Sequence, residues 1–214
     1  MLDPDVRRDL RSLSKEGAEL VARHLVAAGQ LVDEEPERAY QHALAARATA
    51  GRLGVVREAV GITAYAAGHY AQALAELRAA RRISGSPEHL PLMADCERAL
   101  GRPERAVEMA REPDATRLER ASAIELAIVV SGARRDLGEA GAAVLSLQEQ
   151  TLWAGPVVES VLRLRYAYAD ALLAAGRPAD ARTQFLILAA DDADDLTDAV
   201  ERVAELDAVA PTDD

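Results

Sequence analysis

Five short segments of the chain share one pattern, in which a Gly or Glu is followed five positions later by an alanine. The segments begin at Glu34, Gly68, Gly101, Gly138 and Gly176, so successive starts are 34, 33, 37 and 38 residues apart. Glycine ends helices because it adopts the left-handed C-cap conformation without steric cost. Proline, which stands two positions later in three of the segments, suits the first turn of a helix. Each segment is therefore predicted to be a tight turn between two helices.

The residues before these turns follow a second pattern. Seven positions before each turn the residue is small, and eight positions before it the residue is larger. The small residues are Ala27, Gly61, Ala94, Ser131 and Ala169, and the larger ones are Val26, Val60, Met93, Val130 and Tyr168. A small residue in the first helix, facing the alanine early in the second, lets two antiparallel helices pack closely. The sequence thus predicts about five closely packed helix pairs.

The composition favours the same class of fold. Hydrophobic residues make up 50% of the 214 positions but aromatic residues only 3%, and alanine supplies much of the difference. Alanine has the highest helix propensity, whereas the β-branched and aromatic runs typical of sheets are scarce. An all-α protein is expected.

A helix–turn–helix unit of about 34 residues with small residues at these sites resembles the tetratricopeptide repeat. Residues 54–87 carry the resemblance best, through Val60, Gly61, Gly68, His69, Tyr70, Ala73, Leu74, Leu77 and Ala80 and a Ser84–Pro87 break. The large aromatic residue usual in the first helix is replaced by Gln30, Ala64, Glu97, Arg134 and Leu172. Residues 51–105 are also similar to actinobacterial proteins of this family. The resemblance implies a right-handed α-α superhelix of about five pairs, with helices that cap its ends.

The expected organisation follows from this frame. It has an N-terminal helix (1–19), five repeats (20–53, 54–87, 88–123, 124–161 and 162–195), a capping helix (196–208) and a frayed tail (209–214). Pro91 is expected to shorten or kink the first helix of the third repeat. In the capping helix, the stripe of Leu196, Val200, Val203 and Leu206 should cover the last repeat, while Asp198, Glu201, Arg202 and Glu205 face water.

Motifs for chemistry are missing from the sequence. The four histidines and Cys96 have no metal-ligand spacing, and there is neither a P-loop nor a G-x-S-x-G motif. The acidic run Asp191–Asp195 lacks the glycine and distal glutamate of a calcium loop, so a solvated turn that also caps the N-terminus of the next helix is expected. Cys96 is expected to be a buried structural thiol. We therefore expect no metal, no cofactor and no enzymatic activity.

The resemblance implies where a partner would bind, because the first helix of each tetratricopeptide pair lines the concave face. The matching positions, expected to form a partner-binding groove, are Glu58, Ile62, Tyr65, Asp95, Arg98, Arg135, Arg163, Tyr166 and Asp170, with His24, Ala28 and Ile128 beside them. Arginine and tyrosine are enriched at interface hot spots. The alternative is that these charges pair with one another or with solvent and bind nothing.

The expected function is that of a cytoplasmic adaptor or scaffold that binds a peptide or protein surface. The net charge of −11 disfavours nucleic acid, and no apolar run reaches the ~20 residues of a membrane span. Related proteins hold the acidic tails of chaperones with a clamp of Lys, Arg and paired Asn. This sequence has no Asn and a single Lys, Lys15, so such a clamp is not expected. A partner with basic character fits better.

The other possibilities left open are a self-associating structural subunit, an enzyme with hidden carboxylates, and an RNA-binding protein. Trp153 is expected either to pack between repeats or to anchor a partner or a second copy of the chain.

Overall fold

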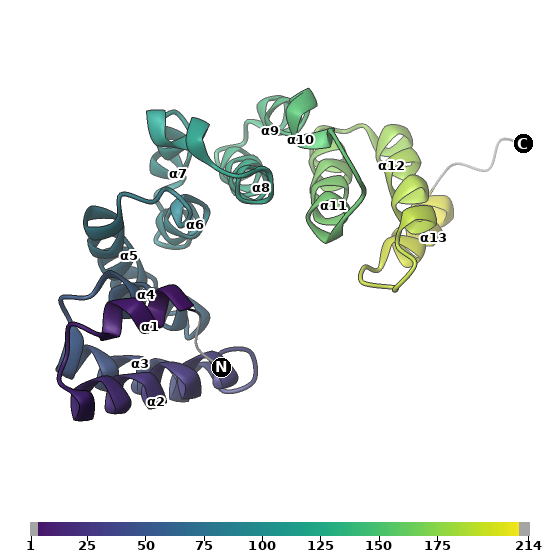
Figure 1. Cartoon of the computed structure of the whole chain (residues 1–214). Helices are drawn as coiled ribbons and strands as arrows, with labels where there is room; N and C mark the ends of the chain where they lie inside the picture. The colour runs from purple at the N-terminus through teal and green to yellow at the C-terminus, as the bar shows by residue number, and fades with distance from the viewer. Residues whose placement is uncertain (1–3, 210–214) are drawn as a thin grey trace, which may run out of the picture. The chain divides into compact units, whose positions relative to one another are not determined.

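The structure is a computed structural model that describes residues 4–209, and this range contains helices but no β-strand. The all-α prediction is confirmed. The chain divides into two compact units, Met1–Arg102 and Pro103–Asp214. Within each unit, helices that follow one another in the sequence pack side by side (Figure 1).

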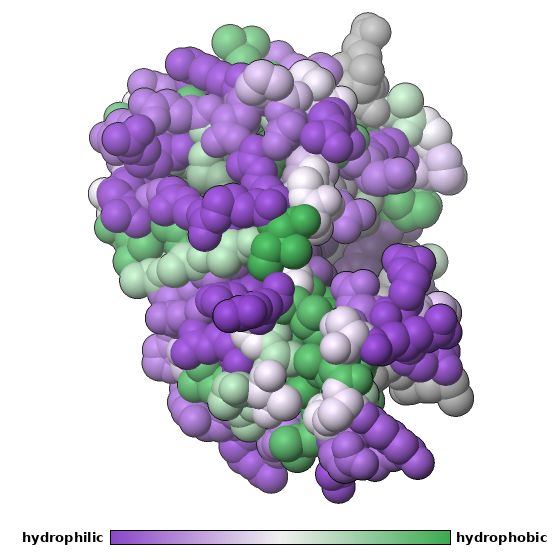
Figure 2. Space-filling view, turned by 60° about the vertical axis from the view of Figure 1, so that its left-hand side comes forward, coloured by the Kyte–Doolittle hydropathy of each residue, from purple (hydrophilic) through white to green (hydrophobic). Residues whose placement is uncertain are grey.

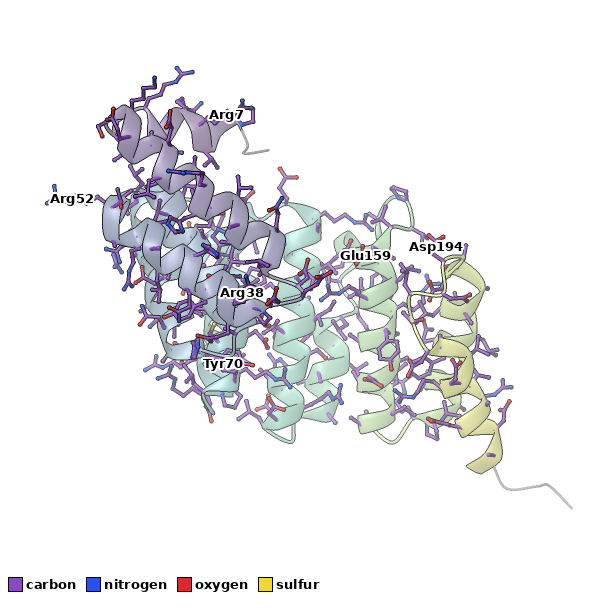
Figure 3. All side chains as sticks on the ribbon, turned by 90° about the horizontal axis from the view of Figure 1, so that it is seen from below. Arg7, Arg38, Arg52, Tyr70, Glu159 and Asp194 are labelled. Atoms are coloured by element: carbon purple, nitrogen blue, oxygen red, sulfur yellow. The ribbon has the colours of Figure 1, made fainter. Side chains whose placement is uncertain are left out.

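The first unit is built from two long helix pairs and two shorter helices. Its helices are α1 (Pro4–Leu10), α2 (Lys15–Leu31), α3 (Pro36–Ala50), α4 (Gly54–Ala66), α5 (Tyr70–Ser84) and α6 (Leu90–Ala99). Helix α2 packs on α3 and α4 packs on α5, and α3 and α4 also touch each other. Figure 3 shows Arg52 and Tyr70, which flank α4 in the sequence, near opposite ends of this helix. The core between the pairs is rich in alanine, with Ala39, Ala43 and Ala46 fully buried.

The second unit has a less regular sequence of helices. They are α7 (Pro103–Met109), the 3₁₀ helix η1 (Pro113–Arg117), α8 (Arg120–Asp136), α9 (Ala140–Ser146), α10 (Gln150–Trp153), α11 (Glu159–Ala174), α12 (Pro178–Asp191) and α13 (Ala199–Val209). Helix α8 packs against α7, α9 and α11, and α12 packs against α11 and α13. Figure 3 shows Glu159 and Asp194 at the same end of the α11–α12 pair, as an antiparallel pair requires.

The predicted turns are confirmed at four of the five positions. Gly68, Gly101, Gly138 and Gly176 have φ between 71° and 77°, and the next residue donates its N–H to a carbonyl five positions back, as His69 does to Ala64 over 2.8 Å. This bond satisfies a carbonyl at the helix end. The first turn is built differently. Val32, the residue that follows α2, has a right-handed helical conformation, and Pro36 opens α3.

The small residues of the first helices are mostly buried. Gly61, Ala94, Ser131 and Ala169 are buried, and Ala27 is half-buried. At Gly61 the approach is closest, because an added Cβ would lie 2.6 Å from the Leu77 side chain on α5. The alternation of small and large side chains therefore reflects helix packing.

The N-terminal boundary differs from the prediction of one helix over residues 1–19. Helix α1 ends at Leu10, and Ser14 caps α2 by accepting a hydrogen bond from the N–H of Gly17 over 3.1 Å. Helix α2 thus starts at Lys15. Pro91 occupies the first turn of α6 and begins the helix there, so α6 is shortened and not kinked.

The predicted capping helix also needs correction. Asp192 accepts hydrogen bonds from the N–H groups of Leu196 and Thr197 and from the Thr197 hydroxyl, which holds residues 192–198 as a loop, so α13 begins at Ala199. The predicted stripe was wrong in part: Ala199 is buried with Val203 and Leu206 beside it, whereas Leu196 and Val200 are 58% and 63% exposed. Residues 210–214 of the predicted tail lie outside the described range.

The helices predicted to be second in the third and fourth repeats are short. Helices α7 and α9 contain seven residues each, and η1 and α10 follow them in place of further helical turns. The proposed repeat boundaries at 88, 124 and 162 therefore stay predictions.

Candidate interaction surface

The residues expected to bind a partner lie on the first helices of the pairs. In the first unit α4 touches α6, and in the second unit α8 packs against α11, so these helices form a continuous layer within each unit. Helix α4 carries Glu58, Ile62 and Tyr65; α6 carries Asp95 and Arg98; α8 carries Arg135; and α11 carries Arg163, Tyr166 and Asp170. We call these nine residues the layer residues.

In the first unit, layer residues join α4 to α6. The Tyr65 hydroxyl donates a hydrogen bond to Asp95 Oδ2 over 2.5 Å, and Asp95 Oδ1 lies 3.4 Å from Arg98 Nη1. Closer to the other end of the helices, Glu58 Oε1 lies 3.2 Å from His89 Nε2. Ile62 is half-buried between these contacts. Tyr65 and Asp95, 30 positions apart in the sequence, are thus part of one polar contact.

The contact with Asp95 predicts a change of stability at alkaline pH. Burial raises the pKa of the Tyr65 phenol far above its ordinary value, and the Asp95 carboxylate raises this pKa further. An unfolded tyrosine loses its proton near pH 10, while folded Tyr65 keeps it. The unfolded state is then favoured as pH rises above about 10. We expect the free energy of unfolding to fall with pH in this range and to fall less steeply in a Tyr65→Phe variant, as measured by urea unfolding. Equal slopes in both proteins would contradict this.

In the second unit, layer residues join α8, α11 and α13. Arg163 Nη2 lies 2.8 Å from Glu125 Oε2, and Asp170 lies 3.8 Å from Arg135 Nη1 and 3.0 Å from Arg202 Nη2. Arg202 Nη1 also donates a hydrogen bond to the Tyr166 hydroxyl over 2.9 Å. The Arg202 guanidinium covers the rings of Phe185 and Tyr166, with its central carbon 4.9 Å and 5.7 Å from their centroids.

Three partners of the layer residues were not among the expected site residues. Arg202 was assigned to the wet side of the capping helix, and it instead contacts α11. Glu125 stands 13 positions before the turn at Gly138, as Arg163 stands 13 positions before Gly176, so the repeat frame could have identified it. His89 has no comparable signal in the sequence.

The charged layer residues therefore have partners within the chain. Figure 2 shows that the face it displays is mostly hydrophilic, with hydrophobic residues in smaller groups among the charges. Exposed ion pairs contribute only about 0–1 kcal/mol each, so a partner can replace them at little cost. Within the first unit, pre-positioned charges lie around the less polar side chains of Ile62 and Tyr65, and within the second unit they lie around Tyr166.

Two other carboxylates are almost fully enclosed. Glu76 on α5 accepts a hydrogen bond from Gln72 over 2.9 Å and pairs with Arg47 and with Arg57, the latter at 2.8 Å. Glu97 on α6, at a position where the repeat family has an aromatic residue, lies 2.6 Å from both Arg78 and Arg102. The Glu76 and Glu97 side chains are only 5% and 4% exposed, so both clusters connect helices and offer no open site.

Trp153 packs inside the second unit. Its Nε1–H donates a hydrogen bond to the Leu147 carbonyl over 2.7 Å, and its ring meets Tyr168 edge-on with centroids 5.9 Å apart. Arg165 lies over the same ring. These contacts match the first of the two expectations, packing between helices.

The remaining groups that could take part in chemistry include Cys96 and the histidines His24 and His42. Cys96 is buried, and burial raises the pKa of its thiol to about 12, which keeps it protonated at neutral pH. His24 and His42 approach to 3.0 Å between their Nδ1 atoms. Among residues 4–209 no three His, Cys, Asp or Glu side chains gather as metal ligands. In the same range no helix combines the length and apolar character that a membrane crossing needs.

An open cleft of about 640 Å³ lies beside α8, where α7 and α9 are short. Leu118, Ala123, Leu126 and Leu152 are among its apolar lining residues. The Arg120 guanidinium at its edge donates two hydrogen bonds to the Leu152 carbonyl, and Thr116, Ser146 and Glu149 add polar groups to the lining.

No model of a known protein family matches the sequence, and no curated protein matches it either. These two comparisons thus add neither a family nor an activity to the geometry.

Proposed function

We propose that the chain is a tetratricopeptide-like solenoid that serves as an adaptor or scaffold for a protein or peptide partner. The observation that carries the proposal is the layer of first helices, on which residues chosen from the repeat frame alone lie together within each unit. The left-handed glycine turns and the close contact at Gly61 support the same assignment. A right-handed superhelix of about five pairs is part of the proposal.

The mechanism is presentation of fixed contacts. Ion pairs such as Arg163–Glu125 hold long side chains in defined positions, which reduces the ordering cost when a partner binds. A partner's charged groups would replace ion pairs that already exist within the chain. Charge complementarity therefore determines how the partner is aligned on the first helices more than how tightly it binds. The affinity comes from the apolar surfaces of Ile62 and Tyr65 where a partner binds the first unit, and of Tyr166 where it binds the second. A partner with some basic character suits the net charge of −11.

The experiment is an affinity capture with the purified chain and two variants of equal charge change. One variant carries Arg98→Ala, Arg135→Ala and Arg163→Ala in the layer. The control carries Arg52→Ala, Arg105→Ala and Arg177→Ala, three exposed arginines outside the layer; Figure 3 shows Arg52 pointing away from the helices. We expect partners retained by the wild type and the control to be recovered at least five-fold less with the layer variant.

Equal recovery by both variants would mean that the layer is not the binding surface. Circular dichroism of each variant checks that the helices remain folded. The alternative, a self-associating structural subunit, predicts a concentration-dependent mass in sedimentation analysis, whereas a monomer at high concentration favours the adaptor.

A further inference from the structure

Helix α13 has a second apolar stripe, which no other described helix covers. At 100° per residue, Ala199, Val203 and Leu206 share one side, and this side packs on the cluster that contains Phe185 and Leu188. Val200, Ala204 and Ala208 follow one another at intervals of four on a different side, and all three are exposed. Leu196, in the loop three positions before the helix, is exposed as well. We call these four residues, Leu196, Val200, Ala204 and Ala208, the outer stripe.

The segment that carries the outer stripe is rich in carboxylates. The unit from Pro103 to Asp214 has 22 acidic and 11 basic residues, so it holds all of the net charge of −11, while residues 1–102 have 14 of each. Residues 191–207 alone contain eight carboxylates and a single basic residue, Arg202.

Some of these carboxylates already have structural roles. Asp191 pairs with Arg165 and Asp207 with Arg182, and Asp192 caps the loop before α13. Asp194, Asp195 and Glu201 have no ion pair with any residue in the range 4–209. The one basic residue of this segment, Arg202, contacts Tyr166 and Asp170 on α11 and also lies 3.5 Å from Glu205. Asp194, Asp195 and Glu201 therefore leave a net negative charge on the segment that carries the outer stripe.

We propose that the outer stripe docks a cationic amphipathic helix of a partner protein, which adds to α13 as α12 adds to α11. The two alanines allow the close approach of a helix backbone, Leu196 and Val200 supply apolar area, and the acidic rim matches Lys or Arg beside the partner's own apolar seam. This surface is separate from the layer residues and does not depend on their role.

The charge selects this occupant over two others. A second copy of the chain would bring two acidic rims together, which is repulsive in a two-fold symmetric contact. A membrane surface rich in anionic lipid would repel the same carboxylates.

The experiment measures fluorescence anisotropy of a labelled synthetic helix that carries a Leu/Ala seam flanked by lysines, at 0.15 M salt. The full chain is compared with Leu196→Ser/Val200→Ser and with Asp194→Asn/Asp195→Asn/Glu201→Gln. The control, Glu104→Gln/Glu108→Gln/Glu139→Gln, changes the charge equally at exposed sites elsewhere in the unit. We expect the serine variant to bind at least ten-fold more weakly, the first charge variant to bind more weakly with a flatter salt dependence, and the control to bind as the wild type does.

The proposal would be overturned by no binding of the lysine peptide by the wild type, by full binding by the serine variant, by equal losses in the two charge variants, or by a dimer that Val200→Ser dissociates. Loss of peptide binding in the Arg98, Arg135 and Arg163 variant would also overturn it, because the peptide would then occupy the layer. Unchanged binding in that variant separates this surface from the proposed function.

Discussion

Replacement of Glu76 by alanine is expected to lower the free energy of unfolding by about 2–4 kcal/mol. The Glu76 side chain is 5% exposed and receives contacts from Arg47 on α3, Arg57 on α4 and Gln72 on its own helix. Removing it leaves two arginines without a counter-charge. Because their side chains are 35% and 32% exposed, water compensates part of this loss, which places the expected value at the lower side of the usual range for broken buried pairs. Urea unfolding followed by circular dichroism measures the change.

The matched control is Glu19→Ala on α2, an exposed carboxylate of the same unit. We expect its effect to stay within about 0.5 kcal/mol, as for ordinary surface substitutions. A loss below 1 kcal/mol for Glu76→Ala would show that water reaches the cluster and that α3, α4 and α5 are held together by their apolar contacts instead.

Gly61→Ala is expected to destabilise the chain by about 1–3 kcal/mol, the usual cost of overpacking a core. Helix propensity alone favours the opposite result by ~1 kcal/mol. The added Cβ, however, would lie 2.6 Å from Cγ and Cδ2 of Leu77 and 3.2 Å from the Leu77 backbone nitrogen, so rotation of the leucine alone cannot remove the overlap. Helices α4 and α5 would have to separate. Thermal and urea unfolding of the variant measure the effect.

Gly29→Ala provides a control of opposite sign. Gly29 lies within α2, and an added Cβ would meet no atom within 4 Å, so we expect stabilisation by about 0.5–1 kcal/mol. The double variant Gly61→Ala/Leu77→Ala should lose less stability than the two single changes together, because the smaller residue 77 makes room for the Cβ. Strict additivity would show that the two positions do not compete for space.

The turns could be predicted from the sequence because their chemistry is local. Gly138 takes its conformation from the preference of glycine for positive φ, and the turn at Gly176 is completed by a proline that opens the next helix. The small residues were predictable for a related reason: contact between two adjacent helices depends on side chains about 16 positions apart, such as Gly61 and Leu77. Both features repeat along the chain, which makes them visible without a structure.

The sequence predicted which positions belong to the candidate site, but it did not predict which residues those positions contact. The frame placed Tyr166 and Asp170 on the first helix of a pair, but their partner Arg202 depends on how α13 is rotated about its axis. The sequence predicted a solvated acidic turn that caps the next helix, but it did not show that Asp192 accepts hydrogen bonds from Leu196 and Thr197 and so holds a loop ahead of α13. Similarly, Glu97 was recognised as a departure from the repeat pattern, but its two arginines come from a neighbouring helix and a turn. Pairings of this kind depend on distances across the fold.

The packing of Trp153 has a spectroscopic consequence. As the single tryptophan, it reports on the second unit alone, where its indole is bonded to Leu147 and lies against Tyr168. Circular dichroism, in contrast, averages over the helices of both units. Emission and ellipticity recorded during one denaturant titration therefore give separate transitions if the two halves unfold independently, and coincident ones if they unfold together. The wild-type chain thus carries its own reporter of cooperativity, and no label needs to be introduced.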